Sequence, residues 1–456
     1  MIVMKFGGTS VESAAAIERV ASIVRARLTR KPVVVVSAMG RTTNKLLAMG
    51  RHAADGEREQ ALELLDEIEQ LHRNEALKMV REEDSSEVVR TIEDHCRELA
   101  EMVRGLAVMG ELTPRSSDAI SSYGERLSSV LVTHAFERCG MRAVHLDSRA
   151  LIVTDHRHTQ AAPVYAETYT RLRSTIPRIV QESVVVMGGF IAATENGVTT
   201  TLGRGGSDFT AAIVGAGIGA EEIQIWTDVD GMLTCDPTIL PGGYRVKTIS
   251  FAEAAELAYF GAKVLHPATV LPAVEKNIPV MILNSRKPEV SGTRIDADAV
   301  RSSNVVKSIA CKSNITIVNV HSTRMLMAHG FLRRIFEVFD RYETPVDMVS
   351  TSEVSVSLTI DAPSRLDQIC QELRQFSEVS IDSNQAIVCL VGDNIRHTPG
   401  VARRVFSAIE AVNIRMISQG ASKLNLSFVV AGEDLRRTVE SLHSEFFREL
   451  DPEVFE

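Results

Sequence analysis

The sequence has no uninterrupted apolar stretch long enough to cross a lipid bilayer. Its N-terminus also lacks the apolar segment of a secretory signal peptide. No run of basic residues stands out, and the formal net charge is -9 at pH 7, so a nucleic-acid-binding surface is not expected. These absences predict a cytoplasmic protein whose partners include neither a membrane nor a nucleic acid.

Paired, metal-binding cysteines are absent as well. The six cysteines are scattered without a C-x-x-C pair, which fits a reducing compartment and argues against a zinc site. Two histidines, His156 and His158, lie close together in "TDHRHTQ", but no further ligand pattern accompanies them. We interpret them as part of a solvated loop and predict no metal site.

The 456 residues are too many for one hydrophobic core, and the first part of the chain has an α/β pattern. Up to about residue 290, short apolar runs alternate with amphipathic stretches; the runs are 32–40, 142–148, 182–190, 222–231 and 278–285. Continuous apolar runs are typical of a mostly parallel sheet covered on both faces. The charged stretch from about 52 to 108 predicts helices that cover this sheet, with a partner surface as the alternative.

The last third of the chain contains an internal duplication. Ser383 opens "SNQAIVCLV" 70 residues after Ser313 opens "SNITIVNVH", and Gly400, which precedes a helix, follows Gly330 by the same interval. A fixed interval across separate elements indicates a repeat. Each unit has the strand and helix order of a ferredoxin-like fold. Because the second unit lacks a final strand, we predict that residues 304–312 supply it and that the units are interleaved.

The stretch "VMKFGGTSVES" near the N-terminus predicts an anion site. A buried strand ends at Lys5, and Gly7 and Gly8 let backbone N–H groups approach a ligand. Thr9 and Glu12 have the spacing of a capping box for the helix that follows. A cation, a glycine nest and a helix start suit phosphate, although a tight turn beside a surface lysine would look similar.

A second glycine-rich stretch, "TTLGRGGSDFT", predicts a site for a carboxylate. Arg204 offers a bidentate fork, and Ser207 or Asp208 could cap the following helix. The glycines that expose backbone N–H groups are Gly203, Gly205 and Gly206. A dinucleotide-like pattern formed further along by Gly215, Gly217 and Ala220 follows a helix instead of a strand, so we interpret it as the end of that helix.

Three other polar segments leave their role open. The hydroxyls of "SAMGRTTNKLL" at Ser37, Thr42 and Thr43 either hold a substrate or cap the next helix. Glu125 in "SSYGERLSS" could equally be a solvated helix residue. The acids of "WTDVDGMLTCDP" suit either a metal or a turn with capping aspartates.

Six motifs occur in a fixed order ahead of the duplicated region: "KFGGTSV", "SAMGRTTN", "GERLS", "GRGGSD", "TDVDG" and "FGAKVLHPAT". With these motifs, the chain resembles the aspartate kinase family along essentially its whole length. The resemblance implies an α/β amino-acid kinase fold at 1–295 and two ferredoxin-like βαββαβ ACT domains, at 313–383 and at 304–312 plus 384–456. It also implies a homodimer through the ACT domains. Because the sequence ends soon after the second repeat, we expect no homoserine dehydrogenase region.

The activity implied by the resemblance is phosphorylation of the side-chain carboxylate of L-aspartate by ATP with Mg²⁺, giving 4-phospho-L-aspartate. This step opens lysine, threonine and methionine biosynthesis. The expected catalytic residues are Lys5, Gly7, Gly8 and Asp208. The expected aspartate-binding residues are Thr43, Glu125, Arg204, Gly205, Gly206 and Ser207, with Arg204 on the α-carboxylate and Glu125 on the α-ammonium. The expected nucleotide contacts are Lys5, Thr227, Asp228, Gly231 and Lys263, and Leu233 and Thr238 replace the Tyr and Arg of some relatives.

The first repeat resembles ACT domains of the lysine-regulated type. The residues that match the family's effector segment are Met325, Gly330, Phe331, Leu332, Val346, Asp347, Ser352 and Glu353. A helix N-terminus would bind the carboxylate of an effector, and the two acids would bind its cation, so lysine is the expected feedback inhibitor. The corresponding stretch of the second repeat, "ASKLNLS", predicts only a capped helix on a sheet.

Two other functions remain open from the sequence. One is another amino-acid kinase of the same fold, such as glutamate 5-kinase or acetylglutamate kinase, although Arg204 and Glu125 favour a free amino acid. The other is an amino-acid sensor with an inactive kinase part, although Lys5 and its companion residues are all present.

Overall fold

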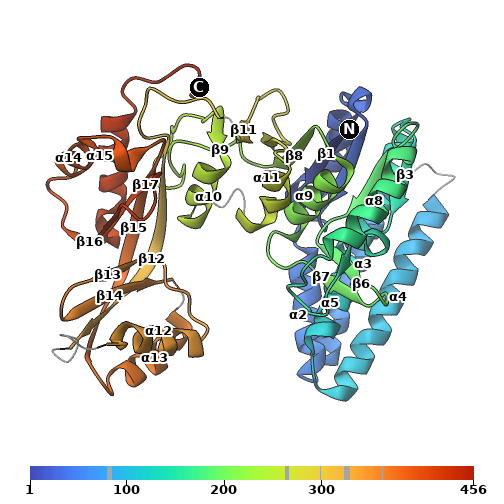
Figure 1. Ribbon diagram of the computed structural model, residues 1–456. Coiled ribbons are helices and arrows are strands. Elements are labelled where there is room, and N and C mark those ends of the chain that lie inside the picture. The colour runs from blue at the N-terminus through green and yellow to red at the C-terminus, as the bar shows by residue number, and fades with distance from the viewer. Residues whose placement is uncertain (80–84, 262–266, 298, 323–328, 362) are drawn as a thin grey trace. The chain divides into compact units, whose positions relative to one another are not determined.

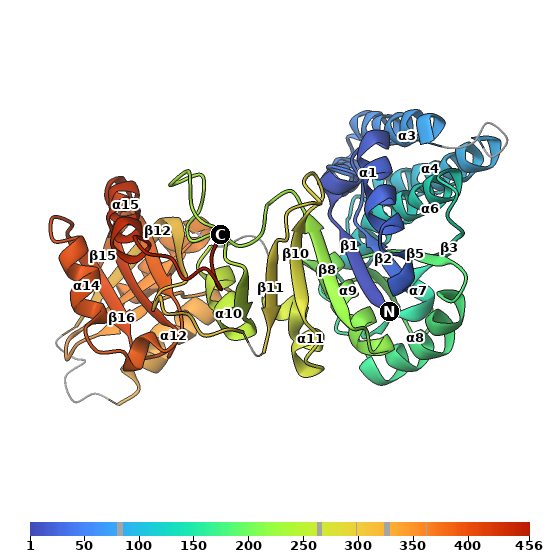
Figure 2. The same ribbon diagram turned by 90° about the horizontal axis from the view of Figure 1, so that it is seen from above.

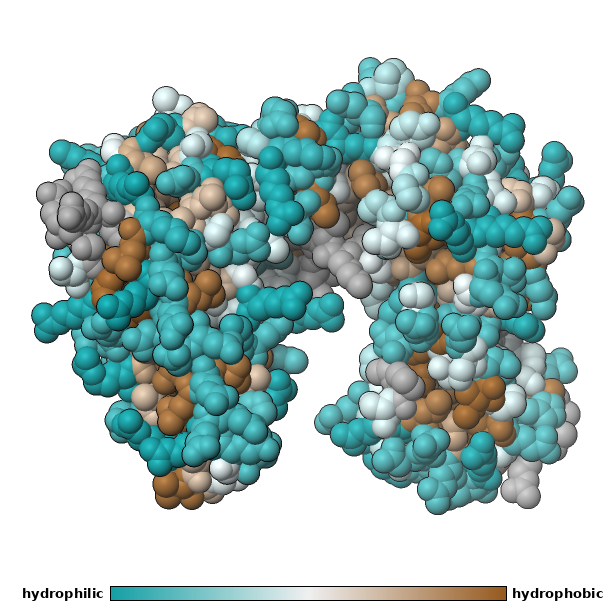
Figure 3. Space-filling model, turned by 180° about the vertical axis from the view of Figure 1, so that it is seen from behind, coloured by the Kyte–Doolittle hydropathy of each residue, from teal (hydrophilic) through white to brown (hydrophobic). Residues whose placement is uncertain are grey.

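The computed structural model describes residues 1–79, 85–261, 267–297, 299–322, 329–361 and 363–456. The chain forms two compact units: Met1–Gly231 with Val264–Asp298, and Met232–Lys263 with Ala299–Glu456 (Figure 1). Within the described residues, none of the helices combines the length and apolar character needed to span a membrane. On the face shown in Figure 3, polar side chains cover most of the surface and apolar residues form small, separate patches.

The first unit is built on a mostly parallel sheet in the order β3-β5-β2-β1-β8-β10-β11 (Figure 2). Only β11 runs antiparallel to its neighbour. The bounds are β1 (Ile2–Phe6), β2 (Pro32–Val36), β3 (Ala143–Leu146), β5 (Val184–Gly188), β8 (Glu222–Thr227), β10 (Val280–Asn284) and β11 (Thr293–Asp296). Every residue of β1, β2 and β5 is buried, which confirms the prediction from the continuous apolar runs.

Helices cover both faces of this sheet (Figure 2). One group packs on the side chains of Ile2, Met4 and Phe6 and contains α1 (Ala14–Arg25), α2 (Thr42–Ala54), α3 (Arg58–Met79), α4 (Ser85–Met109) and α6 (Tyr123–Arg138). The other group contains α8 (Tyr165–Ile179), α9 (Gly206–Ile218) and α11 (Leu271–Glu275). The helices predicted from about 52 to 108 are therefore confirmed.

A small second sheet, in the order β4-β6-β7, lies beside the main one. Its strands are β4 (Val153–Thr154), β6 (Ile191–Thr194) and β7 (Thr199–Thr201), and the nearby helices are α5 (Pro114–Ser121) and α7 (Ser148–Leu151). β7 leads directly into the glycine-rich stretch that begins at Gly203.

The second unit contains one antiparallel sheet in the order β13-β14-β12-β15-β17-β16. The strands are β12 (Ser308–His321), β13 (Val349–Thr351), β14 (Ser355–Ile360), β15 (Glu378–Val391), β16 (Ile414–Gln419) and β17 (Asn425–Ala431). The helices are α12 (Phe331–Arg341), α13 (Leu366–Leu373), α14 (Val401–Ala408) and α15 (Leu435–Phe446). The short elements β9 (Thr248–Ser250) and α10 (Phe251–Tyr259) belong to the same unit.

The duplication is visible in the two long strands, β12 and β15. Residues 308–312 of β12 pair with 387–391 of β15, and residues 317–321 pair with 378–382. Asn314 and Asn384 hold equivalent left-handed conformations, with φ of 59° and 55°, near the change of register. Each long strand thus serves both repeats, so residues 308–312 lie in the sheet of the second repeat. The domain boundaries given above stay a prediction, and the compact second unit also includes Met232–Lys263.

Two predicted helix starts are wrong. Thr9 lies in a short 3-10 turn, and Ser13 caps α1 by accepting a hydrogen bond from the Ala16 N–H at 3.3 Å. The start of α9 has Gly205 as its cap, with φ of 70° and no side-chain bond, so neither Ser207 nor Asp208 is a cap. Thr9 lies too far before α1 to cap it, whereas Ser207 and Asp208 already lie inside α9, beyond its cap.

The interpretation of the pattern formed by Gly215, Gly217 and Ala220 as a helix end is confirmed, because α9 ends within it: Ile218 is its last residue and Gly219 is its C-cap, with φ of 64°. Gly215 and Gly217 themselves lie in the last turns of the helix. A Cβ added to Gly215 would be 2.7 Å from Ile223 Cδ1, and a Cβ added to Gly217 would be 2.6 Å from Leu172 Cδ1. Their small size permits close packing of α9 on its neighbours. The start of α2 does not use the predicted hydroxyl cap. No side chain caps this helix, and the Thr42 hydroxyl donates a hydrogen bond to the Met39 carbonyl.

Candidate active site

A cavity of about 360 Å³ lies in the first unit at the carboxyl ends of β1 and β2. It is lined by Lys5, Gly8, Ser37, Ala38, Gly40, Arg41, Thr43, Asn44, Glu125, Phe190, Gly203, Gly205, Gly206, Ser207 and Asp208. The lining includes the first turns of α2 and α9 and the 3-10 turn at Gly8. Helix starts carry N–H groups without partners in the helix, so their convergence favours an anionic ligand.

Lys5 is the buried cation of the cavity. Its ammonium lies 2.7 Å from Asp208 Oδ1, and the two side chains are 11% and 14% exposed. The ion pair fixes the lysine at the end of β1, because Asp208 is held in the first turn of α9. A largely buried ammonium in this position can neutralise negative charge on a ligand.

Two glycines permit the close approach of backbone around this cation. A Cβ on Gly8 would lie 3.0 Å from both the Ala38 and Gly40 carbonyl oxygens, and a Cβ on Gly206 would lie 2.7 Å from Phe190. The Gly7 N–H already donates to the Trp226 carbonyl at 3.1 Å. The predicted nest therefore does not include the Gly7 donor, because the neighbouring strand β8 uses it.

Glu125 is a buried carboxyl on α6 at the opposite wall. Its Oε1 accepts a hydrogen bond from the Ala38 N–H at 3.1 Å, and within the described residues Oε2 has no hydrogen-bond partner. Burial raises the pKa of Glu125 to about 8, although the backbone N–H groups oppose the shift. The interpretation as a solvated helix residue is wrong, and the unpartnered oxygen suits a cationic ligand group.

The remaining predicted residues differ in their placement. Thr43 and Ser207 line the cavity, whereas Arg204 is exposed and is not among the lining residues. Sequence reasoning missed Arg41, Asn44 and Phe190 as lining residues. The motif "SAMGRTTN" contained the first two, but only the fold shows that the start of α2 faces the cavity.

Of the predicted nucleotide contacts, Lys5 lines the cavity, whereas Thr227, at the end of β8, and Asp228 and Gly231, which follow it, are not among the lining residues. The Thr227 carbonyl accepts a hydrogen bond from the Ser285 N–H at 2.8 Å, and the Thr227 hydroxyl donates to the Asp228 carboxylate. Gly231 has φ of 123°, and an added Cβ would lie 2.6 Å from Thr293 Oγ1. Lys263 lies outside the described residues.

No group of three or more metal-ligating side chains occurs in the part of the chain that the structure describes. Asp236 accepts the Thr238 N–H at 2.8 Å, which supports the turn interpretation of that acidic segment. The interpretation of His158 as solvated is wrong: its side chain is 15% exposed, and Nδ1 lies 2.8 Å from Asp118 Oδ2. His156 is exposed, as expected.

The predicted effector segment lies in the second unit. Gly330, with φ of 79°, caps α12, the Phe331 ring packs edge-on against Phe376, and Leu332 is 41% exposed. Val346 packs on the core of the first repeat. Ser352 accepts the Ser355 N–H in the turn between β13 and β14, where Glu353 is exposed; Met325 lies outside the described residues.

Asp347 in this segment already has an internal partner. Lys312 Nζ lies 2.8 Å from its Oδ1 and 2.7 Å from Asp361 Oδ2, and the Asp347 side chain is 6% exposed. Although burial alone would lower the pKa of Lys312, the bonds to its two carboxylate partners raise it. A cationic effector at Asp347 would therefore meet a carboxylate that a lysine of the same chain neutralises.

The parallel sheet, the cation between converging helix starts and the buried carboxyl define an amino acid kinase. In agreement, residues 1–284 match the amino acid kinase family and residues 388–446 match the ACT domain family. Aspartokinase 2, chloroplastic, of Arabidopsis thaliana is 39% identical, over 99% of this chain and 85% of the relative. Lysine-sensitive aspartokinase 3 of Escherichia coli is 36% identical, over 98% of this chain and 99% of the relative. The chain therefore belongs to the aspartokinase family.

Solved structures show the same similarity. Crystal structures of E. coli aspartokinase III in complex with aspartate and ADP (R-state) and with lysine and aspartate (T-state) match with TM-scores of 0.84 and 0.85. Their sequences are 35% and 36% identical to this chain, and each match covers 98% of this chain and 100% of the other. The amino acid kinase fold followed by ferredoxin-like ACT repeats is thereby confirmed.

Proposed function

We propose that this protein transfers the γ-phosphoryl group of ATP to the side-chain carboxylate of L-aspartate, giving 4-phospho-L-aspartate and ADP. The observation that carries the proposal is one cavity with the Lys5–Asp208 ion pair on one wall and the unpartnered, buried oxygen of Glu125 on another. The relative solved with aspartate and ADP supports this assignment.

The phosphate side of the reaction is assigned to Lys5 and the start of the turn at Gly8. The Lys5 ammonium and the N–H groups of the nearby helix starts fit phosphate oxygens in charge and in hydrogen-bonding type. Lys5 neutralises charge on the transferring group, and Asp208 keeps Lys5 in place. Mg²⁺, bound with ATP, supplies further charge neutralisation at the phosphates. Thr227, Asp228, Gly231 and Lys263 remain the proposed nucleotide contacts.

The amino-acid side is assigned to the opposite wall. Glu125 receives the α-ammonium of aspartate, and Arg204 receives its α-carboxylate by folding in from its exposed position. Thr43, Gly205, Gly206 and Ser207 shape the pocket around the substrate. Both charges of a free amino acid are thus matched, as the proposed substrate requires.

The first experiment is formation of acyl phosphate from L-aspartate, trapped as the hydroxamate, with ATP and Mg²⁺. We expect product with L-aspartate, and none when ATP or Mg²⁺ is omitted. L-Glutamate and N-acetyl-L-glutamate serve as competing substrates. Product from either of these but not from aspartate would overturn the assignment in favour of another amino-acid kinase.

We further propose that lysine inhibits the enzyme through the segment from Gly330 to Glu353, in which its ammonium competes with Lys312 for Asp347. Replacing Lys312 with methionine frees the Asp347 carboxylate, so the lysine concentration for half-inhibition should fall by about tenfold. The matched control is Lys423→Met, at an exposed lysine of the second repeat. Unchanged or weaker inhibition in Lys312→Met would contradict the competition.

A homodimer through the ACT repeats and a cytoplasmic location complete the proposal. All three residues of the outer strand β13 are exposed, so their side chains are available to a second copy. Light scattering that gives the mass of one chain at micromolar concentration would reject the dimer.

A further inference from the structure

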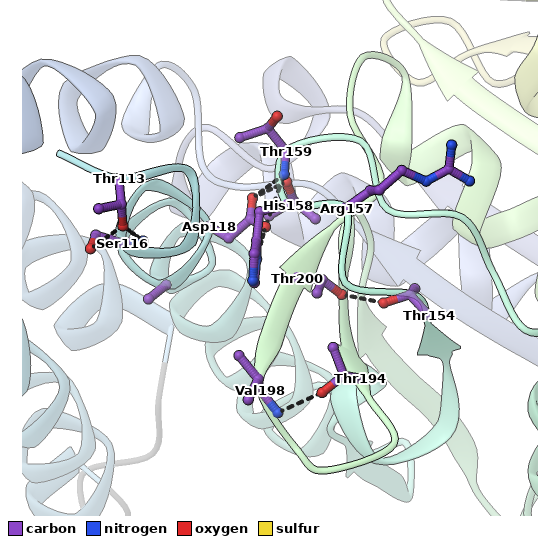
Figure 4. Close-up of polar contacts among 12 residues, drawn as sticks. Thr113, Ser116, Asp118, Thr154, Arg157, His158, Thr159, Thr194, Val198 and Thr200 are labelled. Atoms are coloured by element: carbon purple, nitrogen blue, oxygen red, sulfur yellow. Dashed lines mark hydrogen bonds and ion pairs between the residues drawn. The ribbon is translucent and has the colours of Figure 1, made fainter.

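Asp118 on α5 is a buried carboxylate that the proposed reaction does not use. It is 1% exposed. Its oxygens accept the Thr159 N–H at 3.0 and 2.9 Å and the Thr201 hydroxyl at 2.6 Å, and Oδ2 lies 2.8 Å from His158 Nδ1. Figure 4 shows His158 and Thr159 gathered at the Asp118 carboxylate. One side chain thus joins α5, the loop 155–160 and β7.

The loop that Asp118 holds has a backbone conformation that needs support. Thr159 has φ of 70°, in the left-handed region that β-branched residues rarely adopt. Its N–H is the group bound by both Asp118 oxygens. At the other end of the loop, Asp155 accepts the N–H groups of Arg157 and Ala162. The carboxylate therefore secures the strained position of the loop.

The same loop forms the support behind the glycine-rich wall of the cavity. A Cβ on Gly203 would lie 3.1 Å from the Thr159 carbonyl oxygen and 3.2 Å from Gln160 Cγ, so the two backbones are in close contact. The Ala161 N–H also donates to the Thr201 carbonyl at 2.9 Å. Asp118 thus fixes both the strand that enters the wall and the loop on which Gly203 rests.

We propose that Asp118 is a positioning residue for the amino-acid substrate: it holds Thr201 and the loop 155–160, and through them the cavity wall from Gly203 to Ser207. The inference rests on the proposed function, because that wall is assigned to L-aspartate. Lys5 reaches the cavity from β1, and its partner Asp208 is held in the first turn of α9, beyond the wall that Asp118 supports. Loss of Asp118 should therefore weaken aspartate binding and leave the nucleotide side intact.

The test compares Asp118→Asn and Thr201→Val with Ser116→Ala in the full chain. Ser116 lies on the same helix but bonds only to Thr113 in this network (Figure 4), so it is the matched control. We expect KM for L-aspartate to rise by about tenfold in the first two variants, with KM for ATP and kcat within about twofold of wild type. Thr159→Gly, which relieves the strained φ, should keep the wild-type KM.

An equal rise in both KM values, or an unchanged KM for aspartate in Asp118→Asn and Thr201→Val, would overturn the proposal. Hydrogen exchange of the amides from Thr201 to Ser207 gives a readout that does not depend on activity. We expect faster exchange there in Asp118→Asn and wild-type rates in Ser116→Ala; unchanged rates would also overturn it. If the wild-type enzyme does not use aspartate, the proposed function fails, and the exchange rates alone decide the positioning role.

Discussion

Replacing Lys5 with methionine is expected to lower kcat for acyl phosphate formation by about 10³-fold. The ammonium is the buried cation of the cavity, and the loss of one such group where charge develops removes transition-state stabilisation directly. KM for aspartate should change much less, because Glu125 and Arg204 are assigned to that substrate. Steady-state hydroxamate kinetics with varied ATP and aspartate measure both effects.

Loss of the lysine also leaves Asp208 without its partner, so folding needs a separate check. Thermal unfolding of Lys5→Met and of Lys5→Arg distinguishes misfolding from lost catalysis, since arginine keeps the charge. Lys45→Met, which removes a partly exposed pair with Glu67, is the control for removing a lysine from the first unit. A folded Lys5→Met protein with kcat within tenfold of wild type would exclude Lys5 from the assigned role.

Glu125 should make the ligand-free protein less stable as the pH rises. Its pKa is about 8 in the folded protein, whereas a glutamate in the unfolded chain titrates near 4.5. Between these values the folded state keeps a proton that the unfolded state has lost. The free energy of unfolding should therefore fall with rising pH, by up to about 1.4 kcal/mol per pH unit from this one group. Its contribution is fully present below pH 4.5 and is lost above pH 8.

Glu125→Gln removes this titration. The free energy of unfolding of the variant, measured with denaturant and compared with that of the wild type, should therefore increase from pH 5 to pH 8. Glu87→Gln, at an exposed position on α4, should follow the wild-type curve. The same Glu125→Gln variant should raise KM for L-aspartate by about 100-fold, since the ammonium loses its carboxylate. Parallel stability curves for wild type and Glu125→Gln would show that the carboxyl ionises normally in the folded protein.

The sheet and the repeat could be predicted because they depend on patterns that extend over many residues. The continuous apolar runs fixed β2, β5, β8 and β10 to within a few residues, and the 70-residue interval located β12 and β15. In the cavity, Lys5, Glu125 and the stretch from Gly205 to Asp208 came from sequence motifs, and the structure brings them together.

The errors concern choices between neighbouring residues that local sequence does not decide. Thr9 and Ser13 are both good capping residues for α1, and Ser207 is a good one for α9. Which residue holds the capping position is decided by tertiary contacts. The burial of His158 depends on Asp118, which lies 40 positions away. The role of Arg41 likewise depends on how the start of α2 is turned, which its own motif does not reveal.

The shared strands β12 and β15 also affect how the chain is made. Residues 308–312 are synthesised before the first repeat, whereas their pairing partners at 387–391 are synthesised only after it. At about 5–20 residues per second, this interval lasts several seconds. During synthesis, the first repeat can close its own half of the sheet while the start of β12 still waits for a neighbour. The two repeats are therefore a single folding unit with a fixed order of completion, and neither can be released as a separate module without leaving half of a strand unpaired.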